Sequence, residues 1–269
     1  MNSLKFLGTA GARFVMISQM RASGGIWISL LGENLLLDPG PGSLVRALSS
    51  KPKLNPKQLS GILLSHRHLD HSGDLNVMIE AMTEGGYDRR GVIWTPKDAF
   101  LGDDPVVLRY LRNYPERFEM LEPDKTFRLG EVKFSAHPLD HGVESYGFNF
   151  YHPRSGEVFL SLVTDTLFSP DLPERFPGKV LLLNLVLTEP KSYQIKHLKL
   201  QDLNEFLKVK RQAVILTHFG MGMLKQKPWE LARRLSEEHQ TRIVAAADGM
   251  NFDLSPWLNG SVPAFKPQD

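Results

Sequence analysis

The sequence predicts an α/β fold in which two β-sheets pack together and helices cover the outside. Three observations support this prediction. The chain has 269 residues, a length that suits one two-layered domain spanning residues 1–269. Its composition, 42% hydrophobic and 23% charged, is that of a globular protein with a large core. Short apolar runs recur through the first and last thirds of the chain, with helical patterns interspersed.

Strands are expected wherever a short, mostly apolar run is bounded by turn residues. The runs Ile26–Leu31 and Asn34–Asp38 flank Gly32 and Glu33 and predict a hairpin. The run Val180–Leu187 is apolar enough to be buried on both faces of its sheet. The expected strands are Ile26–Leu31, Asn34–Asp38, Gly61–Ser65, Val132–Ala136, Gly147–Tyr151, Val158–Val163, Val180–Leu187, Ala213–Leu216 and Ile243–Ala247.

Helical patterns occupy other stretches. We expect a helix to start at Asn76–Thr83, a second to include Val106–Asn113, and further helices at Leu203–Lys208 and Pro228–His239. The longer stretch Met78–Pro115 has two interpretations: it walls a substrate pocket, or it is plain helical packing. Length and pattern alone leave other α/β folds open.

The composition also limits the functions that are open to the chain. A net charge of +2 and a pI near 8.7 favour an anionic partner only weakly and do not indicate a nucleic-acid platform. The absence of cysteine excludes disulfides, thiolate metal ligands and a cysteine nucleophile. The N-terminus lacks the apolar run of a signal peptide, and no stretch approaches the roughly 18 apolar residues of a membrane helix. We therefore expect a cytoplasmic protein with no membrane partner.

The segment Ser65–His71, with the sequence SHRHLDH, carries the strongest functional signal. It directly follows the apolar run GILL, and loops at strand ends commonly carry functional sites. Three imidazoles and a carboxylate side by side are costly to bury unless something binds them. Imidazole and carboxylate together suit zinc, manganese or iron. The alternative is a solvated loop that is merely rich in histidine.

The pattern His66-x-His68-x-Asp70-His71 resembles the HxHxDH signature of the metallo-β-lactamase superfamily. The resemblance extends from Leu7-Gly8-Thr9 to Asp248-Gly249-Met250, which is nearly the whole chain. It implies a four-layer αββα sandwich of two mixed β-sheets with helices outside.

The later ligands of that family are a His, an Asp and a His, and this chain supplies candidates in the same order. Taken singly, each candidate would more often be a structural histidine or a turn aspartate. They are His141 in PLDHG, Asp165 in VTDT after a predicted strand, and His218 in LTHF after another.

The resemblance also implies how the ligands divide between metals. In the family, residues matching His66, His68 and His141 bind one metal, those matching Asp70, His71 and His218 bind the second, and the residue matching Asp165 bridges both. We therefore expect two divalent ions, with zinc favoured over manganese or iron. Such a pair clamps a bridging hydroxide and lowers its pKa toward about 7.

The remaining histidines have competing interpretations. His137 is a rival of His141 for the third ligand. We favour His141 because the following segment Glu144–Phe148 resembles the His-then-(Phe/Tyr)-Gly-(Phe/Tyr) segment of one subgroup. His152 lies in a predicted turn and His239 at a predicted helix end, so both are expected on the surface.

Two aspartates are expected to assist the metals. Asp38, in the segment LLDPG, matches the Asp-x-Gly of the family at a strand end. Ligand histidines usually donate their other ring N–H to a carboxylate, and Asp38 is the candidate for that role. The alternative is a turn aspartate before Pro-Gly. Asp70 is the candidate general base that orients the attacking hydroxide.

His197 is the candidate general acid. It lies just before a predicted helix and matches a histidine that ribonuclease Z and the cyclic phosphate phosphodiesterases carry there. In those enzymes this histidine is thought to assist the leaving group or contact the phosphate, and an imidazole suits proton donation near neutral pH. The alternative is an exposed histidine beside Lys196 and Lys199.

Four features resemble the ribonuclease Z and cyclic phosphate phosphodiesterase branch of the superfamily: Leu7–Gly11, Ser145–Gly147, His197 and Asp248–Met250. The absence of cysteine excludes the β-lactamases with a cysteine ligand, and the segment LDHG disfavours the glyoxalase II type. Two departures stand against the branch. The stretch after Asp165 has no room for a long tRNA-gripping arm, and the cysteine-based zinc site of some cyclic phosphodiesterases is missing.

These features favour a phosphodiesterase that acts on a small phosphodiester or nucleotide-like substrate. A hydrolase of a lactone or thioester is an alternative, because the same hydroxide attacks carbonyl carbon. A ribonuclease Z-like nuclease that processes RNA 3′ ends is another, but the scattered basic residues do not support RNA as a partner. A di-iron redox module would need a flavin partner. A homodimer is left open, since dimers are common among similar proteins.

Overall fold

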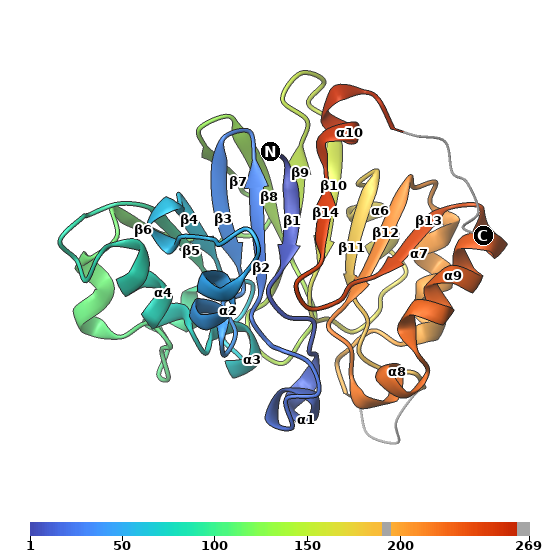
Figure 1. Cartoon of the computed structure of the whole chain (residues 1–269), viewed down its shortest axis with the longest axis horizontal. Coiled ribbons are helices and arrows are strands. Elements are labelled where there is room, and N and C mark those ends of the chain that lie inside the picture. The colour runs from blue at the N-terminus through green and yellow to red at the C-terminus, as the bar shows by residue number, and fades with distance from the viewer. Residues whose placement is uncertain (190–194, 263–269) are drawn as a thin grey trace.

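The computed structural model describes residues 1–189 and 195–262, which form two seven-stranded sheets packed face to face. Helices cover the outer face of each sheet, so the layers run helix, sheet, sheet, helix (Figure 1). The predicted four-layer sandwich of two mixed sheets is confirmed.

The first sheet is antiparallel at one end and parallel at the other. The chain enters it through β1 (Ser3–Phe6), forms the predicted hairpin of β2 (Ile26–Leu30) and β3 (Glu33–Leu37) around Gly32, and then continues in parallel strands. In spatial order its strands are β14 (Asn251–Asp253), β1 (Ser3–Phe6), β2 (Ile26–Leu30), β3 (Glu33–Leu37), β4 (Gly61–Leu63), β5 (Val92–Thr95) and β6 (Arg117–Met120).

The second sheet has the same mixed design. Antiparallel pairing joins β7 through β10, and parallel pairing joins β10 through β13. In spatial order its strands are β13 (Arg242–Ala245), β12 (Ala213–Thr217), β11 (Val180–Asn184), β10 (Val158–Val163), β9 (Tyr146–Tyr151), β8 (Val132–Pro138) and β7 (Thr126–Leu129).

The side chains of the strands alternate between two apolar layers. On β11, Val180 and Leu182 pack into the core between the sheets, whereas Leu181 and Leu183 pack outward beneath the helices. Burial on both faces accounts for the uninterrupted apolar run that predicted this strand. The central strands β11 and β12 therefore have no solvated face, and their polar residues, Asn184 and Thr217, lie at their carboxyl ends.

The stretch Met78–Pro115 packs over the outer face of the first sheet. Met78, Ile79 and Met82 of α4 join Leu111 in one apolar cluster with the outward side chains of the sheet. These contacts favour the packing interpretation for most of the stretch. The elements on this face are α2 (Ser43–Ser49), the 3₁₀ helix η1 (Pro56–Gln58), α4 (Leu75–Met82), α5 (Lys97–Leu101) and the 3₁₀ helix η2 (Arg109–Asn113).

The opposite outer face is covered by amphipathic helices of the C-terminal half. Leu203 and Phe206 of α7 and Leu231 and Leu235 of α9 bury their side chains against the second sheet. The helices on this side are α6 (Leu172–Arg175), α7 (Leu200–Lys208), α8 (Met221–Lys225) and α9 (Pro228–His239). The predicted bounds of α9 are confirmed.

Three short helices lie at one end of the sandwich: α1 (Ala12–Ile17), α3 (Leu69–Ser72) and α8 (Figure 1). The carboxyl ends of the parallel strands point to this end. The last helix, α10 (Ser255–Asn259), lies near the other end. None of the helices in the described ranges combines the length and apolar character that crossing a membrane requires.

Two predicted elements are wrong in part. The helix predicted at Val106–Asn113 forms only as η2, because the side chain of Asn76 accepts from the N–H of Leu108 and donates to the carbonyl of Val106, replacing helical hydrogen bonds there. The strand predicted to reach Leu187 ends at Asn184. Beyond Asn184 the chain turns into a buried loop. Residues 190–194 lie outside the described residues.

Candidate metal centre

All of the predicted ligand residues lie together where strands of the two sheets end. The first sheet supplies the segment His66–His71, which follows β4 and enters the short helix α3. The second sheet supplies His141 from the loop between β8 and β9, Asp165 after β10 and His218 after β12. Because ligands come from both sheets, the packing of the sheets brings the cluster together.

The donor atoms divide into two groups, within each of which all atoms lie within 4.8 Å of one another. The first group is His66, His68 and His141. The second group is Asp70, His71, Asp165 and His218. Asp165, which the sequence predicts to bridge both metals, belongs to the second group and also lies 3.9 Å from Nε2 of His141 in the first.

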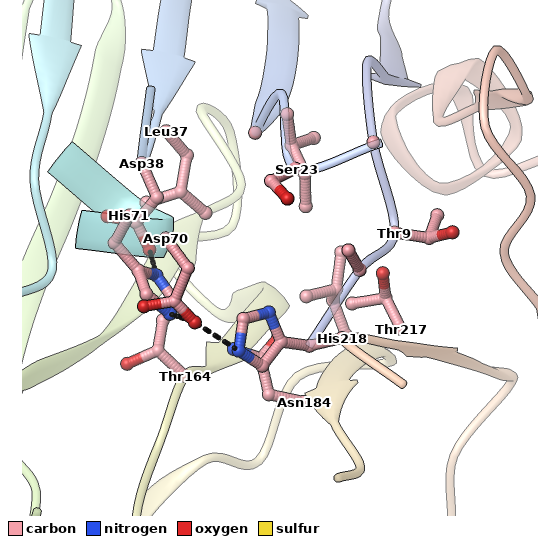
Figure 2. Close-up of a pocket in the computed structure, with 15 residues that line it drawn as sticks. Thr9, Ser23, Leu37, Asp38, Asp70, His71, Thr164, Asn184, Thr217 and His218 are labelled. Carbon is pink, nitrogen blue, oxygen red and sulfur yellow. Dashed lines mark hydrogen bonds and ion pairs between the residues drawn. The ribbon is translucent and has the colours of Figure 1, made fainter. Parts of the chain in front are cut away.

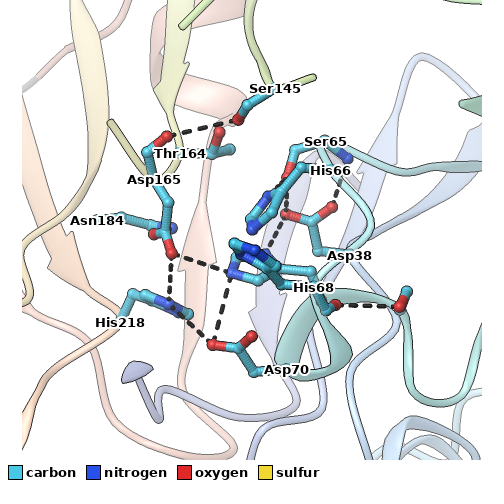
Figure 3. A network of polar contacts seen from close by, with 12 residues as sticks. Asp38, Ser65, His66, His68, Asp70, Ser145, Thr164, Asp165, Asn184 and His218 are labelled. Atoms are coloured by element: carbon cyan, nitrogen blue, oxygen red, sulfur yellow. Dashed lines mark hydrogen bonds and ion pairs between the residues drawn. The ribbon is translucent and has the colours of Figure 1, made fainter. Parts of the chain in front are cut away.

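Asp165 has the most central carboxylate of the cluster (Figure 3). Its Oδ2 lies 3.2 Å from Nε2 of His218 and 3.4 Å from Nε2 of His71. Asp70 stands at the more exposed side, with Oδ2 3.6 Å from Nε2 of His218. His68 is exposed, whereas His66 is fully buried. The cluster is therefore open to solvent on the side of His68 and Asp70.

Asp38 orients two of the histidine rings. Its carboxylate accepts the Nδ1 proton of His71 at 2.8 Å and the hydroxyl of Ser65 at 2.7 Å. Because the only hydroxyl proton of Ser65 goes to Asp38, the contact of 3.0 Å between Ser65 Oγ and Nδ1 of His66 must use the ring proton. The neutral ring of His66 therefore presents an unprotonated Nε2 to the centre of the cluster, and Asp38 turns Nε2 of His71 toward the same centre.

His141 is oriented by the main chain. Its Nδ1 proton is donated to the carbonyl of Lys196 at 2.8 Å, which leaves Nε2 free to face His68. His137, the rival candidate, lies outside the cluster and bonds to Asp124 and Ser135. The preference for His141 over His137 agrees with this geometry.

The donor set fits divalent cations. Nε2 of His66, His71 and His218 is buried without a hydrogen-bond partner, which is costly unless another group binds there. Nε2 of His71 and Nε2 of His218 each lie within 3.8 Å of carboxylate oxygens of Asp70 and Asp165. Neutral imidazoles with carboxylates form a borderline ligand set suited to zinc, manganese or iron.

The electrostatics of the cluster support the same conclusion. Burial lowers the pKa of His66 well below its ordinary value, so this ring is neutral near pH 7. Burial alone would also lower the pKa of His71, but Asp38, Asp70 and Asp165 together raise it well above its ordinary value. Three carboxylates around one imidazole favour positive charge at that point, and a divalent cation supplies it.

Comparison with known proteins identifies the family. The sequence profile of the beta-lactamase superfamily domain matches residues 33–219, which include every residue of the cluster. This chain belongs to the metallo-β-lactamase superfamily.

Its relatives within the superfamily include proteins of similar length. The uncharacterized protein MJ1374 of Methanocaldococcus jannaschii is 30% identical over 265 residues, covering 95% of each chain. A ribonuclease Z of Kineococcus radiotolerans is 25% identical over 176 residues, covering 64% of this chain and 54% of that enzyme. The aligned region thus spans about half the length of that ribonuclease Z.

Solved structures confirm the superfamily fold. The metallo-β-lactamase fold protein YhfI of Bacillus subtilis superimposes with a TM-score of 0.73 at 16% identity, covering 93% of this chain and 98% of that one. A diphosphatase from the PhnP family superimposes with a TM-score of 0.66 at 20% identity, covering 94% and 98%. The chain is a hydrolase of the metallo-β-lactamase fold with ribonuclease Z relatives.

His197 lies beside the superfamily cluster rather than on the open surface. Its Nδ1 is 3.4 Å from Oδ2 of Asp165, and its ring centroid is 4.9 Å from that of His141. With these two residues it forms a third group of donors within 4.8 Å. Burial lowers the pKa of His197, which favours its neutral ring. The alternative of an exposed histidine is wrong.

Asn184 is a member of the site that sequence reasoning missed. Its amide donates to Oδ1 of Asp165 at 2.9 Å and leaves Oδ2 of that carboxylate facing the histidines (Figure 3). The signal in the sequence was a single polar residue inside the apolar run VLLLNLVL. Asn184 ends β11 at the same edge where β10 and β12 deliver Asp165 and His218.

A small hollow of about 40 Å³ lies behind the cluster. Figure 2 shows Asp38, His71 and Asp70 on one side of it, with Thr9 and Thr217 on the other. Gly40 does not line the hollow itself but packs closely against the backbone of Ser23 and Asp70, which do. A Cβ at Gly40 would lie 2.1 Å from the carbonyl oxygen of Asp70 and 2.0 Å from that of Ser23.

Two of the features that resembled the phosphodiesterase branch contact one another. Thr9 donates its hydroxyl to Asp248 at 2.7 Å, and the same carboxylate accepts the N–H of Ala22. These bonds tie the segments after β1 and before β14 together. The two histidines expected on the surface are instead half-buried: His152 donates from Nε2 to the carbonyl of Leu258, and His239 packs at the end of α9.

Proposed function

We propose that this protein is a metal-dependent phosphodiesterase. The observation that carries the proposal is the pairing of two donor groups with His197, an imidazole placed 3.4 Å from the carboxylate that both groups approach. The two donor groups suit divalent metals, and the added imidazole suits a reaction that ends with protonation of a leaving oxygen. The sequence relatedness to ribonuclease Z, whose name implies cleavage of a phosphodiester, supports this assignment.

We assign His66, His68 and His141 to one metal and Asp70, His71 and His218 to the second, with Asp165 shared. Zinc is the first candidate, with manganese or iron as alternatives, because imidazole and carboxylate ligands suit all three ions. When bound, the pair supplies Lewis acidity and a water molecule acidic enough to attack near neutral pH.

The residues of the chain then divide the remaining tasks. Asp70, at the open side of the cluster, accepts a proton from the attacking water and orients it. His197 donates a proton to the leaving oxygen on the opposite side of the phosphorus. The anionic charge of a phosphodiester beside the ring favours its protonated form and offsets the effect of burial on its pKa.

The substrate that fits this proposal is a small phosphodiester or a nucleotide-like molecule. In the described residues between Asp165 and His197, only the short helix α6 and β11 are present. No extended basic arm stands among them to grip a folded RNA. The cluster opens to solvent beside Asp70, which suits a compact substrate.

The proposal is tested by hydrolysis of bis-p-nitrophenyl phosphate by metal-stripped protein to which Zn²⁺ or Mn²⁺ is returned. We expect turnover that depends on the metal and falls by at least about 100-fold in His68→Ala, while His137→Ala keeps it. Absence of metal-dependent turnover, or full activity in His68→Ala, would contradict the proposal. Parallel assays with lactones, thioesters and a pre-tRNA show whether another bond is the better substrate.

A further inference from the structure

The proposed metal centre is assembled from two loops that belong to different sheets. His66 and His68 follow β4 of the first sheet, whereas His141 follows β8 of the second. The ring centroid of His141 lies 4.8 Å from each of the other two. The first donor group therefore exists only while the two loops are held in register, and the following inference rests on the proposed function of this group.

Glu144 and Asp98 join the two loops through reciprocal hydrogen bonds. The N–H of Asp98 donates to Oε2 of Glu144 at 3.0 Å, and the N–H of Glu144 donates to Oδ2 of Asp98 at 3.3 Å. Asp98 belongs to α5, which follows β5 of the first sheet. Glu144 lies three residues after His141 in the second sheet. This pair thus bridges the sheets beside the cluster.

Both ends of the pair continue into the cluster. On one side, Nε of Arg67 lies 3.2 Å from Oδ2 of Asp98, and Arg67 stands in the chain between His66 and His68. On the other side, the hydroxyl of Tyr146 donates to Oε1 of Glu144 at 2.8 Å. The N–H of Tyr146 donates in turn to the carbonyl of Ser65 at 3.1 Å. Glu144 is therefore the shared member of two connections to the His66 loop.

The charges around Glu144 explain how it affects the position of the two loops that carry the proposed ligands. The carboxylates of Asp98 and Glu144 repel each other, and Arg67 and the two N–H donors offset that repulsion. Removal of Glu144 leaves the N–H of Asp98 without its acceptor and the hydroxyl of Tyr146 with only the longer contact of 3.4 Å to the carbonyl of Leu121, and it frees Asp98 to draw Arg67 into a new position. The His66 loop and the His141 loop then lose their common support.

We propose that Glu144 is a positioning residue that holds His141 against His66 and His68, so that it selectively supports the first of the two metal sites. The second site depends on Asp38 and Asn184, neither of which contacts Glu144.

The test is a Co²⁺ titration of the metal-stripped protein, followed by the visible absorption of the bound ion. We expect two binding events in the wild type. Glu144→Ala weakens one of them by at least about tenfold and leaves the other within about twofold, and Glu144→Gln, which keeps one acceptor oxygen, weakens the same event less. His68→Ala marks the affected event, because it removes a ligand of the first group.

Glu157→Ala is the matched control, since Glu157 is an exposed glutamate of the same sheet that pairs with Lys179 away from the cluster. If Glu144→Ala leaves both Co²⁺ binding events unchanged, or weakens both equally, the proposed role of Glu144 is wrong. If Glu144→Ala does not fold, an unchanged Glu144→Gln overturns it as well. A wild type that binds no Co²⁺ contradicts the proposed function instead, so the two failures are distinguishable.

Discussion

Nδ1 of His71 donates to Oδ2 of Asp38 across 2.8 Å, and the same carboxylate accepts the N–H and the hydroxyl of Ser65. Asp38 directly follows β3 and Ser65 follows β4, its parallel neighbour. The backbone of Asp38 has a positive φ of 49°, a conformation that costs about 1 kcal/mol or more for a residue other than glycine. The carboxylate of Asp38, which is carried on this strained backbone, thus orients His71 directly and His66 through Ser65.

Replacing Asp38 by Asn is expected to weaken metal binding by about 10- to 100-fold, because the ring of His71 loses a charged acceptor while the volume is kept. Metal content after dialysis and titration with Zn²⁺ measure the effect. Asp124→Asn is the control, because Asp124 makes an equivalent contact of 2.7 Å with His137 outside the cluster. Equal metal affinity in the two variants would refute the assignment of Asp38.

Asn184→Ala is expected to lower metal affinity by about tenfold, because Oδ1 of Asp165 loses its donor and the carboxylate is free to rotate. Asn149→Ala is the comparison: Asn149 is a buried asparagine of the same sheet that bonds to Ser161 and to the carbonyl of Arg175. It is expected to lower the free energy of unfolding by about 1–2 kcal/mol and to leave metal affinity unchanged. The reverse pattern would show that Asn184 only supports the fold.

His197→Ala is expected to slow the hydrolysis of diesters with an alkyl leaving group by about 100-fold or more, because such a group needs a proton to depart. Bis-p-nitrophenyl phosphate, whose leaving group departs without a proton, is expected to be affected much less. The measurement is kcat for both substrates at saturating metal. An equal loss with both substrates would assign His197 to binding rather than to proton transfer.

The metal-stripped protein is expected to lose stability as the pH falls from about 7.5 to about 5.5. Burial lowers the pKa of His66, His68, His141 and His197. Below the ordinary pKa of 6.5, these histidines therefore bind protons in the unfolded chain that they do not bind in the folded state. His71 has the opposite shift, so its contribution to stability grows as the pH falls toward 6.5 and is fully present below that value, where it no longer offsets the loss from the other rings.

Thermal unfolding in a chelator at several pH values measures this dependence. A midpoint that rises on acidification would mean that His71 outweighs the four other rings. Addition of Zn²⁺ is expected to raise the midpoint most at pH above 7, because ligand imidazoles must be neutral to bind the ion.

Gly40→Ala is expected to lower the free energy of unfolding by about 3 kcal/mol or more, because its Cβ would meet the carbonyl oxygens of Ser23 and Asp70 at 2.0 and 2.1 Å. Metal affinity should fall with it, since the backbone of Asp70 must move. Gly156→Ala is the control, with a φ of 72° but open space around its Cβ, and should cost about 1–2 kcal/mol. Urea unfolding of both variants decides the comparison.

Most of the candidate ligands could be predicted from the sequence because they directly follow an apolar run that ends in a turn. The segment His66–His71 directly follows one run, and Asp165 and His218 follow two others. Parallel neighbours end at the same edge of a sheet, so residues far apart in the chain meet there. The helix predicted at Val106–Asn113 was wrong in its first half, because a side chain from α4 replaces its backbone hydrogen bonds.

The sequence by itself predicted a two-sheet architecture and the candidate ligands in their order, because periodicity and local motifs depend on neighbouring residues. It also indicated Asp38 as the partner of a candidate ligand, but only the tertiary structure decided which atoms that carboxylate contacts and which other groups orient the candidate ligands. Asn184 on Asp165, the carbonyl of Lys196 on His141 and Glu144 on Asp98 are contacts between segments that no local pattern connects. Their partners are chosen by how the two sheets pack, and that packing depends on the whole core at once.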